Sequence, residues 1–474
     1  MIKICIYIIS TLFLFCASDA GAGRSGRIVN VYYYPWYGSN IHWPDGYLRG
    51  KLFPSQPPSL GEYNSRDTAV INQHLRWSDT YGINNWICSW WGPNSYEDVT
   101  IHTKISAVIE AYHATYCLFY ESAGLLTVQN SQISFDSANT AKLRSDFMYI
   151  ANSYFPDPKY LRINGRPVVF IYLTRIFTGN YAQAFQLVRK DIQLLGYTIY
   201  LIGDEVYWGT PTTARIATLD AITGYNMHGP SQYAGYPSAT NFISDVGLLY
   251  DQYSAAAKQL GVGFIPNTMA GFNDRAVRLS SNHYIIPNKF APDSDDVSTL
   301  RQFTKMAISH TDSSLNMIAI TSFNEWHEDT EIEPTIDSSP TSLDNSQTGY
   351  DYTLGYSYAG YGLGYLEVIR SLLPGNPTRV QGAAHHANKY MLGQNYPNPF
   401  NPVTTIRYQT VREGRVTMMV YNLIGQEVST PVDGEKAPGA YEVRFDGGKL
   451  PSGIYFYRMS ARGYSEVKKM LLLK

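Results

Sequence analysis

The sequence predicts an α/β fold, a (β/α)8 TIM barrel followed by a small all-β immunoglobulin-like sandwich. Three observations lead to this prediction. Eight short apolar runs rich in Val, Ile and Tyr follow one another up to residue 323, segments with helical spacing separate most of them, and only strand-like runs remain after residue 392. Strands alternating with helices indicate parallel βαβ units, and eight such units close a barrel. A doubly wound open sheet is the alternative built from the same units.

The elements of the barrel follow from these patterns in order. The eight expected strands are Ile28–Tyr34, Asn84–Trp90, Thr115–Tyr120, Pro167–Leu173, Thr198–Gly203, Ala221–Tyr225, Gly263–Asn267 and Asn316–Phe323. Between them, apolar residues recur every three or four positions, which places them on one face of a helix. The expected helices are Asp67–Tyr81, Ile101–His113, Ala138–Tyr154, Tyr181–Leu195, Phe242–Leu260 and Tyr358–Leu373, the last ended by Pro374.

The composition divides the chain into four parts. Residues 1–20 are interpreted as a secretory signal peptide, because Lys3 precedes a short apolar run and small residues follow it. The barrel is expected over residues 27–373 and a polar linker over residues 374–391. Residues 392–474 contain strand-like runs divided by Gly- and Pro-containing turns, which predicts the sandwich. No later stretch reaches about 20 apolar residues, so we expect no transmembrane anchor.

Charge and cysteine content exclude several classes of protein. The net charge is -2 and charged residues make up 16% of the chain, so no basic face for nucleic acid is expected. The chain has 40 Tyr and 8 Trp residues, an excess that fits a carbohydrate-binding surface, although most of these rings belong in cores. Beyond the signal peptide only Cys88 and Cys117 remain. We interpret both as small buried side chains, with a disulfide as the alternative.

The candidate catalytic residues follow the last expected strand. The apolar run Met317–Phe323 ends in Asn324, Glu325 and Glu328, with Trp326 and His327 between the two carboxylates. Cleavage of a glycosidic bond needs two carboxyl groups at one sugar. Barrel enzymes keep their catalytic groups just beyond the C-terminal ends of the strands. Other strand ends bring aromatic and acidic residues to the same side: Tyr34, Trp36, Tyr37, His42, Trp43, Trp91, Glu121, Glu205 and Tyr225.

Several motifs occur in the order and approximate spacing of glycoside hydrolase family 99, the endo-α-mannosidases and endo-α-mannanases. They are Tyr32-Tyr-Tyr-Pro-Trp-Tyr-Gly38, Ser59-Leu-Gly-Glu-Tyr63, Cys88-Ser-Trp-Trp91, Phe119-Tyr-Glu121, Asn164-Gly-Arg-Pro167 and Ser322 to Pro334. The chain resembles this family from about Arg27 to Leu373. The resemblance implies a retaining (β/α)8 enzyme that cuts inside an α-mannoside chain and needs neither a metal nor a cofactor.

The resemblance also assigns roles. Glu325 would be the base that deprotonates the 2-hydroxyl of the sugar, and Glu328 would be the general acid. The expected substrate-binding residues are Tyr34, Trp36, Tyr37, His42, Trp43, Trp91, Glu121, Tyr225, Asn324 and His327. The sequence departs from the family pattern where Gly92 precedes Pro93 and where Asp329 replaces a usual Gly. These departures lie in loops, so the reaction type is better supported than the identity of the sugar.

The C-terminal segment resembles a different family. Gln394-Asn-Tyr-Pro-Asn-Pro-Phe-Asn-Pro402, Val420-Tyr-Asn-Leu-Ile-Gly-Gln426, Gly453-Ile-Tyr-Phe-Tyr457 and the terminal Lys468 to Lys474 are similar to the sorting domain read by the type IX secretion machinery of Gram-negative bacteria. The resemblance implies that the machinery recognises residues 392–474 and that the enzyme is secreted or held at the cell surface after passing through the periplasm. A sugar-binding sandwich is the alternative.

Three other functions remain open from the residues alone. The first is a glycosidase that uses Glu205 with Glu325 through a covalent glycosyl-enzyme. The second is a non-catalytic surface protein that holds glycans on Trp36, Trp43 and Trp91. The third is a metal enzyme built on His42 and His327, although the His-Glu-x-x-His arrangement of zinc enzymes is absent.

Overall fold

The computed structural model describes residues 26–227, 236–279, 284–291 and 294–373, and residues 390–474 apart from positions 394, 396–397 and 438. The expected signal peptide and most of the expected linker lie outside these ranges. The chain forms two compact units, residues 1–376 and residues 377–474. Each is described by itself.

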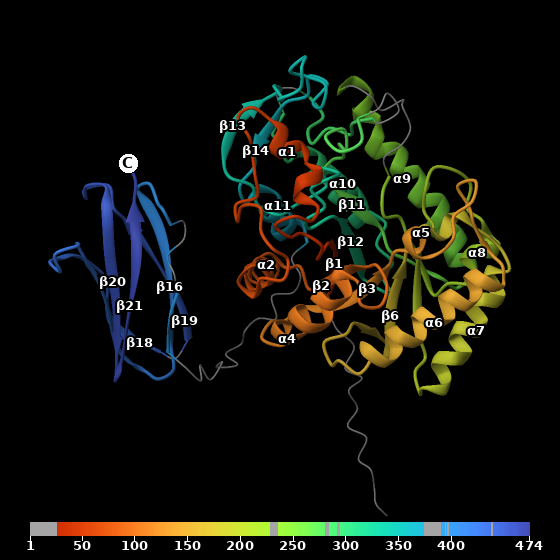
Figure 1. Cartoon of the computed structure of the whole chain (residues 1–474), viewed down its shortest axis with the longest axis horizontal. Helices are drawn as coiled ribbons and strands as arrows, with labels where there is room; N and C mark the ends of the chain where they lie inside the picture. The colour runs from red at the N-terminus through yellow and green to blue at the C-terminus, as the bar shows by residue number, and fades with distance from the viewer. Residues whose placement is uncertain are drawn as a thin grey trace, which may run out of the picture. The chain divides into compact units, whose positions relative to one another are not determined.

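The first unit is built around a curled parallel sheet, which confirms the predicted barrel class (Figure 1). Hydrogen-bonded neighbours follow the order β11-β12-β1-β2-β3-β6-β8-β9-β10. The strands are β1 (Ile28–Tyr33), β2 (Asn85–Trp90), β3 (Thr115–Tyr120), β6 (Arg166–Ile171), β8 (Tyr200–Asp204), β9 (Ala221–Thr223), β10 (Gly263–Phe264), β11 (Asn267–Met269) and β12 (Met317–Thr321). Each of the eight predicted runs therefore contains a barrel strand.

The two ends of this sheet meet in one interrupted strand. Strands β10 and β11 are separated only by Ile265 and Pro266. Proline has no N–H to give to a ladder, so it breaks the strand where it stands. The flanking groups still reach both neighbours, because the Ile265 N–H donates to the Ile222 carbonyl at 2.9 Å and the Pro266 carbonyl accepts from the Ala319 N–H at 3.0 Å. The sheet thus closes through residues 263–269.

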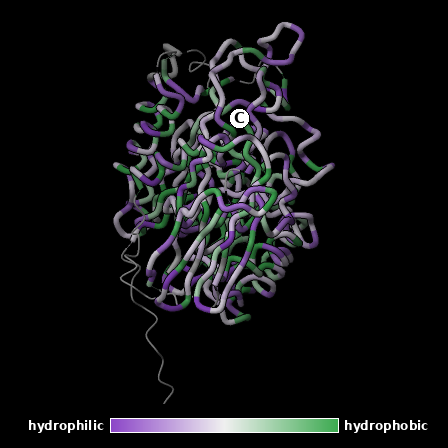
Figure 2. The backbone as a smooth tube through the Cα atoms, turned by 90° about the vertical axis from the view of Figure 1, so that its left-hand side faces the viewer, coloured by the Kyte–Doolittle hydropathy of each residue, from purple (hydrophilic) through white to green (hydrophobic). Residues whose placement is uncertain are grey.

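Helices surround the strands (Figure 1). The longer ones are α2 (Thr68–Tyr81), α6 (Ser137–Ser153), α7 (Tyr181–Leu194), α9 (Tyr236–Gln259), α10 (Ser298–Ser309) and α11 (Gly364–Leu372), and the helical segment α3-η2-α4 runs from Tyr96 to Ile109. Hydrophobic and hydrophilic residues alternate along the backbone (Figure 2), as expected when helices pack one face on a sheet. In the part of the chain that the structure describes, no helix has the length and apolar content of a membrane span.

Shorter elements fill the loops between these helices and strands. The short helices are α1 (Leu48–Lys51), α5 (Ser122–Leu125), α8 (Thr213–Ile216), η1 (Trp43–Asp45) and η3 (Thr174–Ile176), and the short strands are β4 (Ile133–Phe135), β5 (Arg162–Ile163) and β7 (Phe177–Gly179). Several of them begin directly at a strand end, as α5 does after β3, so they help to shape that side of the barrel.

Strands β1, β2 and β3 are buried along their whole length, as their largely apolar runs predict. Tyr33 and Trp86 stack in the core with ring centroids 4.1 Å apart and nearly parallel planes. Cys88 and Cys117 are both buried and free, which agrees with the interpretation as small core side chains and not with a disulfide.

The predicted helix Tyr358–Leu373 was wrong in its first turns. Tyr358–Gly360 is strand β14, which pairs antiparallel with β13 (Ser338–Thr341), and helix α11 begins only at Gly364. The spacing of the tyrosines imitated a helix, but a side chain at Gly360 would lie 2.0 Å from the Ile336 carbonyl oxygen. The close pairing of two backbones explains the glycine.

The second unit contains two antiparallel sheets, and the strand pattern fits the predicted sandwich. One sheet has the order β15-β16-β19 and the other β18-β17-β20-β21. The strands are β15 (Met391–Leu392), β16 (Val403–Thr410), β17 (Gly414–Tyr421), β18 (Glu427–Lys436), β19 (Gly439–Asp446), β20 (Gly453–Ala461) and β21 (Tyr464–Leu472). Its core is separate from that of the barrel and includes Ile406, Met418, Tyr457 and Met470.

Candidate active site

Glu325 lies just beyond the C-terminal end of β12 and is almost completely buried. Its backbone N–H donates to the Ser322 hydroxyl at 2.8 Å. One carboxylate oxygen, Oε1, accepts the His327 backbone N–H at 3.2 Å and lies 3.4 Å from the His327 Nδ1. The other, Oε2, is buried and has no hydrogen-bond partner among the residues that the structure describes. An unpaired buried acceptor costs about 1–3 kcal/mol, so this oxygen is placed to receive a donor from a ligand.

Glu328 lies beside Glu325 and is more accessible. Its Oε2 is 3.4 Å from the Tyr225 hydroxyl and its Oε1 is 3.3 Å from the Arg278 Nη2. The Glu328 carbonyl accepts the Asn273 N–H at 2.7 Å, which joins this loop to the segment that follows β11. Arg278 also lies 3.4 Å from Asp274 and is half exposed. Sequence reasoning missed Arg278, which belongs to none of the motifs or expected strand ends.

Burial and mutual repulsion shape the titration of this pair. Burial and the neighbouring charge of Glu328 raise the pKa of Glu325 well above its usual value. Burial also raises the pKa of Glu328, but Arg278 opposes the shift. Two adjacent buried carboxyl groups titrate as a unit, and repulsion between like charges favours a single proton shared by the pair. The pair can therefore supply one acid and one base.

Two sets of buried contacts hold the loop that carries Glu325 and Glu328. Glu333 accepts the Tyr63 hydroxyl at 2.7 Å and the Trp326 Nε1–H at 2.9 Å, and its other oxygen lies 3.0 Å from the His74 Nε2. All of these groups are buried. Trp326, between the two carboxylates, is thereby fixed to residues that are distant in the sequence.

The second contact is a buried ion pair next to Glu328. The Arg49 Nε lies 2.7 Å from Asp329 and 3.6 Å from Glu331, and all three side chains are buried. Asp329 has a left-handed backbone with φ +52°. Glycine adopts this conformation most easily, and the family usually has Gly at this position. The ion pair between Asp329 and Arg49 accounts for the aspartate in this chain.

Glu121, at the end of β3, is connected to Trp91, which follows β2, through the hydroxyl group of Ser89. The Ser89 hydroxyl donates to Glu121 Oε1 at 2.7 Å, and the Trp91 Nε1–H donates to the Ser89 oxygen at 2.9 Å. Burial raises the pKa of Glu121 to about 8, although the bond from Ser89 opposes the shift. Trp91 remains 38% exposed, so part of its side chain is accessible to solvent.

Aromatic rings connect Trp91 to the carboxylate pair. Trp36 lies between them, with ring centroids 6.2 Å from Trp91 and 5.8 Å from His327. Tyr34 donates its hydroxyl hydrogen to the Tyr225 hydroxyl at 2.6 Å. His42 stacks on Trp36 at 4.4 Å. These rings and the carboxylates form one continuous set.

Three of the expected substrate-binding residues lie behind this set. The Asn324 side chain accepts the Tyr34 N–H at 2.7 Å and donates to the Tyr34 carbonyl at 3.0 Å. The Tyr37 hydroxyl accepts the Trp326 N–H at 3.0 Å. The Trp43 Nε1–H donates to the Tyr63 carbonyl at 2.7 Å. These polar groups are hydrogen-bonded to the protein itself. Their contacts therefore support a structural role around the loop that carries Glu325 and Glu328.

Glu205 is likewise engaged with the protein. Its Oε1 pairs with Arg215 at 2.7 Å and its Oε2 accepts the Thr174 hydroxyl at 3.0 Å. Both oxygens of this carboxylate are thus occupied by protein donors, so these contacts disfavour the alternative that uses Glu205 as a nucleophile.

His42, Asp45 and His327 are the described residues that come nearest to a metal-ligand cluster, with ligand atoms within 4.8 Å of one another. His327 Nε2 lies 3.0 Å from the His42 carbonyl oxygen. A carbonyl only accepts, so Nε2 carries a proton and is not available as a metal ligand. Burial lowers the pKa of His327, which keeps the ring neutral with its Nδ1 lone pair facing Glu325.

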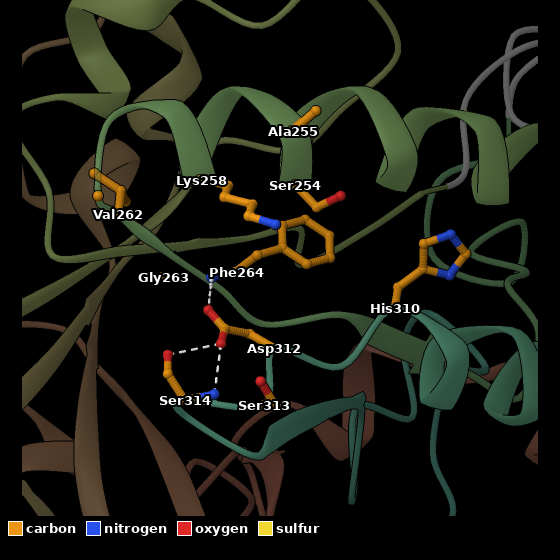
Figure 3. Close-up of a pocket in the computed structure, with 11 residues that line it drawn as sticks. Ser254, Ala255, Lys258, Val262, Gly263, Phe264, His310, Asp312, Ser313 and Ser314 are labelled. Carbon is orange, nitrogen blue, oxygen red and sulfur yellow. Dashed lines mark hydrogen bonds between the residues drawn. The ribbon is translucent and has the colours of Figure 1, made fainter.

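A cavity of about 500 Å³ lies elsewhere, against residues at the C-terminal end of α9 and before β12 (Figure 3). Asp312 accepts hydrogen bonds there from Ser314 and from the Phe264 N–H. Because β10 and β12 run parallel, residues that precede them lie at the opposite end of the barrel from Glu325, which follows β12. This cavity is therefore separate from the carboxylate pair.

Comparisons with known proteins agree with this geometry. The chain is 25% identical over 356 residues to a glycoprotein endo-alpha-1,2-mannosidase of Xenopus laevis, covering 65% of this chain and 70% of that protein. It is 23% identical over 375 residues to a glycoprotein endo-alpha-1,2-mannosidase-like protein of Mus musculus, covering 69% and 74%. The GH99 endo-alpha-mannosidase of Bacteroides thetaiotaomicron in complex with bis-tris-propane shares the fold, with a TM-score of 0.52, 20% identity, and coverage of 73% of this chain and 96% of that one.

Sequence profiles identify both units. Residues 394–473 match the secretion system C-terminal sorting domain, so the second unit is a sorting domain of the type IX class. Residues 50–354 match glycosyl hydrolase family 99. The first unit is therefore a glycoside hydrolase, and the chain belongs to family 99.

Proposed function

We propose that the chain is an exported endo-acting α-mannosidase or α-mannanase that works through participation of the sugar's own 2-hydroxyl group. Glu325 is the base and Glu328 the general acid. The observation that carries the proposal is the buried Oε2 of Glu325, which has no partner among the described residues and lies beside a second carboxyl group. A sugar hydroxyl that donates to this oxygen supplies the missing hydrogen bond.

The reaction then proceeds in two balanced steps. Glu325 takes the proton of the 2-hydroxyl, the freed oxygen attacks C1, and Glu328 gives its proton to the departing glycosidic oxygen. Water next attacks C1 of the anhydrosugar, Glu328 takes the proton of that water, and Glu325 returns its proton to O2. In an α-mannoside the axial 2-hydroxyl is trans to the leaving group, so attack is in line, and intramolecular attack has a large effective molarity. Two inversions retain the anomeric configuration.

The roles require the proton of the pair to sit on Glu328 at the moment of reaction. In the ligand-free chain Arg278 contacts Glu328 and favours charge there. A substrate hydroxyl that donates to Glu325 Oε2 favours charge on Glu325 instead. Substrate binding thus moves the shared proton toward Glu328, the group that must donate it.

Product analysis tests the proposal. The wild-type chain is incubated with α-mannans, α-glucans and glucosylated mannose oligosaccharides, and new reducing ends and product lengths are measured. We expect internal cleavage of an α-mannoside and its loss in Glu328→Gln. No new reducing ends from any α-mannoside would overturn the proposal and favour a glycan-binding protein.

A matched substitution separates the two glycosidase mechanisms. We expect Glu205→Gln to retain far more turnover than Glu328→Gln, because the contacts of Glu205 are internal. Equal loss in both variants would favour a covalent mechanism through Glu205.

The sorting domain supports export as part of the proposal. Its match to a secretion system C-terminal sorting domain favours a site of action at the cell surface or in the medium of a Gram-negative bacterium. Fractionation of such a host, with activity assayed in the medium, the envelope and the cytoplasm, tests this expectation. Activity confined to the cytoplasm would contradict it.

A further inference from the structure

We propose that Ser89 and Gly124 are positioning residues that fix the plane of the Trp91 ring, and that they thereby set how the chain recognises the sugar next to the one that is cleaved. The inference rests on the proposed function for its substrate. It assigns a role to two residues that do not themselves reach the carboxylate pair.

Ser89 fixes one edge of the ring. It is buried on β2, two positions before Trp91, and its oxygen accepts the indole N–H at 2.9 Å. The same hydroxyl donates to Glu121 at 2.7 Å. The tryptophan and the acid are therefore oriented by one atom. Because the indole N–H is used internally, Trp91 offers a ligand its face, which stacks on the C–H face of a pyranose, and no hydrogen-bond donor.

Gly124 fixes the other side of the ring. It belongs to the short helix α5, which starts directly after Glu121. A Cβ at this position would lie 2.3 Å from Trp91 Cζ3 and 2.7 Å from Cε3. Such distances are far below van der Waals contact, so any side chain at residue 124 has to push the ring away. The six-membered ring of Trp91 thus packs closely against Gly124 of α5.

Gly92 completes the arrangement. Its φ of +101° is readily adopted only by glycine, and a Cβ there would lie 3.0 Å from Leu125 Cδ2 on α5. The turn after Trp91 therefore packs on the same helix as the ring. This is the position where the sequence departs from the family pattern, and it lets the chain turn immediately after the tryptophan.

The order of the rings identifies the sugar concerned. Trp36 separates Trp91 from His327, which adjoins Glu325. A sugar over Trp91 is therefore a neighbour of the sugar held at the carboxylate pair. Tilting the ring should weaken binding of that neighbour while leaving the reacting carboxyl groups in place.

A double-mutant cycle tests the positioning role. The substrate is the α-linked oligosaccharide that the wild-type chain cleaves fastest. We expect Gly124→Ala and Ser89→Ala each to lower kcat/KM about 3- to 10-fold, mainly through KM, as for the loss of one aromatic contact. Trp91→Phe removes the ring atoms that a methyl group at residue 124 would strike, so Gly124→Ala should have little further effect in that background. Equal effects of Gly124→Ala in both backgrounds, or a loss confined to kcat, would overturn the inference.

A spectroscopic arm is independent of activity. Chains labelled with 5-fluorotryptophan give a ¹⁹F signal for Trp91, identified by its absence in Trp91→Phe. We expect this signal to shift in Gly124→Ala and in Ser89→Ala. Gly247→Ala is the matched control, because a Cβ there meets Met306 only at 3.5 Å, and it should leave both the signal and turnover unchanged. An unmoved Trp91 signal in Gly124→Ala would overturn the inference even if no α-mannoside is cleaved, which separates its failure from that of the proposed function.

Discussion

Replacing Arg278 by methionine should move the pH profile of the enzyme to higher pH. The Arg278 Nη2 lies 3.3 Å from Glu328 Oε1. At that separation two unit charges attract by about 5 kcal/mol at an effective dielectric constant of 20 and by about 1.3 kcal/mol in bulk water. Arg278 is 51% exposed, so the interaction should lie near the water limit. We therefore expect a shift of about one pKa unit.

The direction of the shift follows from the charge that Arg278 favours. Its cation stabilises the ionised form of Glu328 and, more weakly, of Glu325, and so opposes the rise in both pKa values caused by burial. Without it, the pair holds its shared proton to higher pH. The alkaline limb of the kcat/KM profile, where the general acid loses its proton, should shift to higher pH by about one unit. The acidic limb should shift in the same direction by less.

The assay is kcat/KM across the acidic and alkaline range for the wild type, Arg278→Met and the control Arg301→Met. Arg301 pairs with Asp295, and both side chains are exposed, so its removal should leave the profile in place. An alkaline limb that stays fixed or falls in Arg278→Met would refute the reasoning, because Arg278 would then not be lowering the pKa of the acid.

Three further predictions concern stability and domain independence. Arg49→Met should destabilise the chain by about 3–5 kcal/mol in urea unfolding, because it leaves two buried carboxylates without their cation. Arg144→Met, which removes a partly exposed pair, should cost far less, and similar costs would contradict this difference. The pKa of Glu121 is raised to about 8, so the folded chain keeps a proton that the unfolded chain loses above about pH 4.5. The free energy of unfolding therefore decreases as the pH rises from about 4.5 to about 8. Glu121→Gln should therefore gain stability relative to wild type by up to about 1.4 kcal/mol per pH unit over that window, and a gain independent of pH would exclude the shift. A chain ending at residue 376 should unfold cooperatively and retain turnover because the barrel has its own core; loss of turnover on truncation would show that the second unit is needed.

The spacing of apolar residues predicted most of the fold, because it reflects which positions of each strand and helix are buried. Strands β1, β2 and β3, for example, are buried at every position and consist of largely apolar runs. The prediction failed at Tyr358–Gly360, where tyrosines at helical spacing belong to a strand and the glycines allow close backbone pairing. Strands β18 and β21 give a weaker apolar signal, because most of their residues are exposed or partly buried and several are charged.

The site was predicted only as far as strand ends could place it. Glu325, Glu328, Glu121 and Trp91 follow strands directly, so their meeting on one side was a consequence of topology. Arg49, His74 and Glu333 gave no local signal. Arg49 reaches Asp329 across 280 positions of the sequence and His74 reaches Glu333 across 259, so only tertiary packing reveals these pairs.

The attachment of Glu333 to Tyr63, His74 and Trp326 has a consequence for engineering this enzyme. Glu333 accepts hydrogen bonds from Tyr63, Trp326 and His74, and all four side chains are buried. Libraries that vary loop residues outside this anchor should therefore leave the positions of Glu325 and Glu328 unchanged, provided that Tyr63, His74, Trp326 and Glu333 are kept. In such a scaffold, substitutions in the loops can change glycan specificity during evolution while the carboxylate pair is retained.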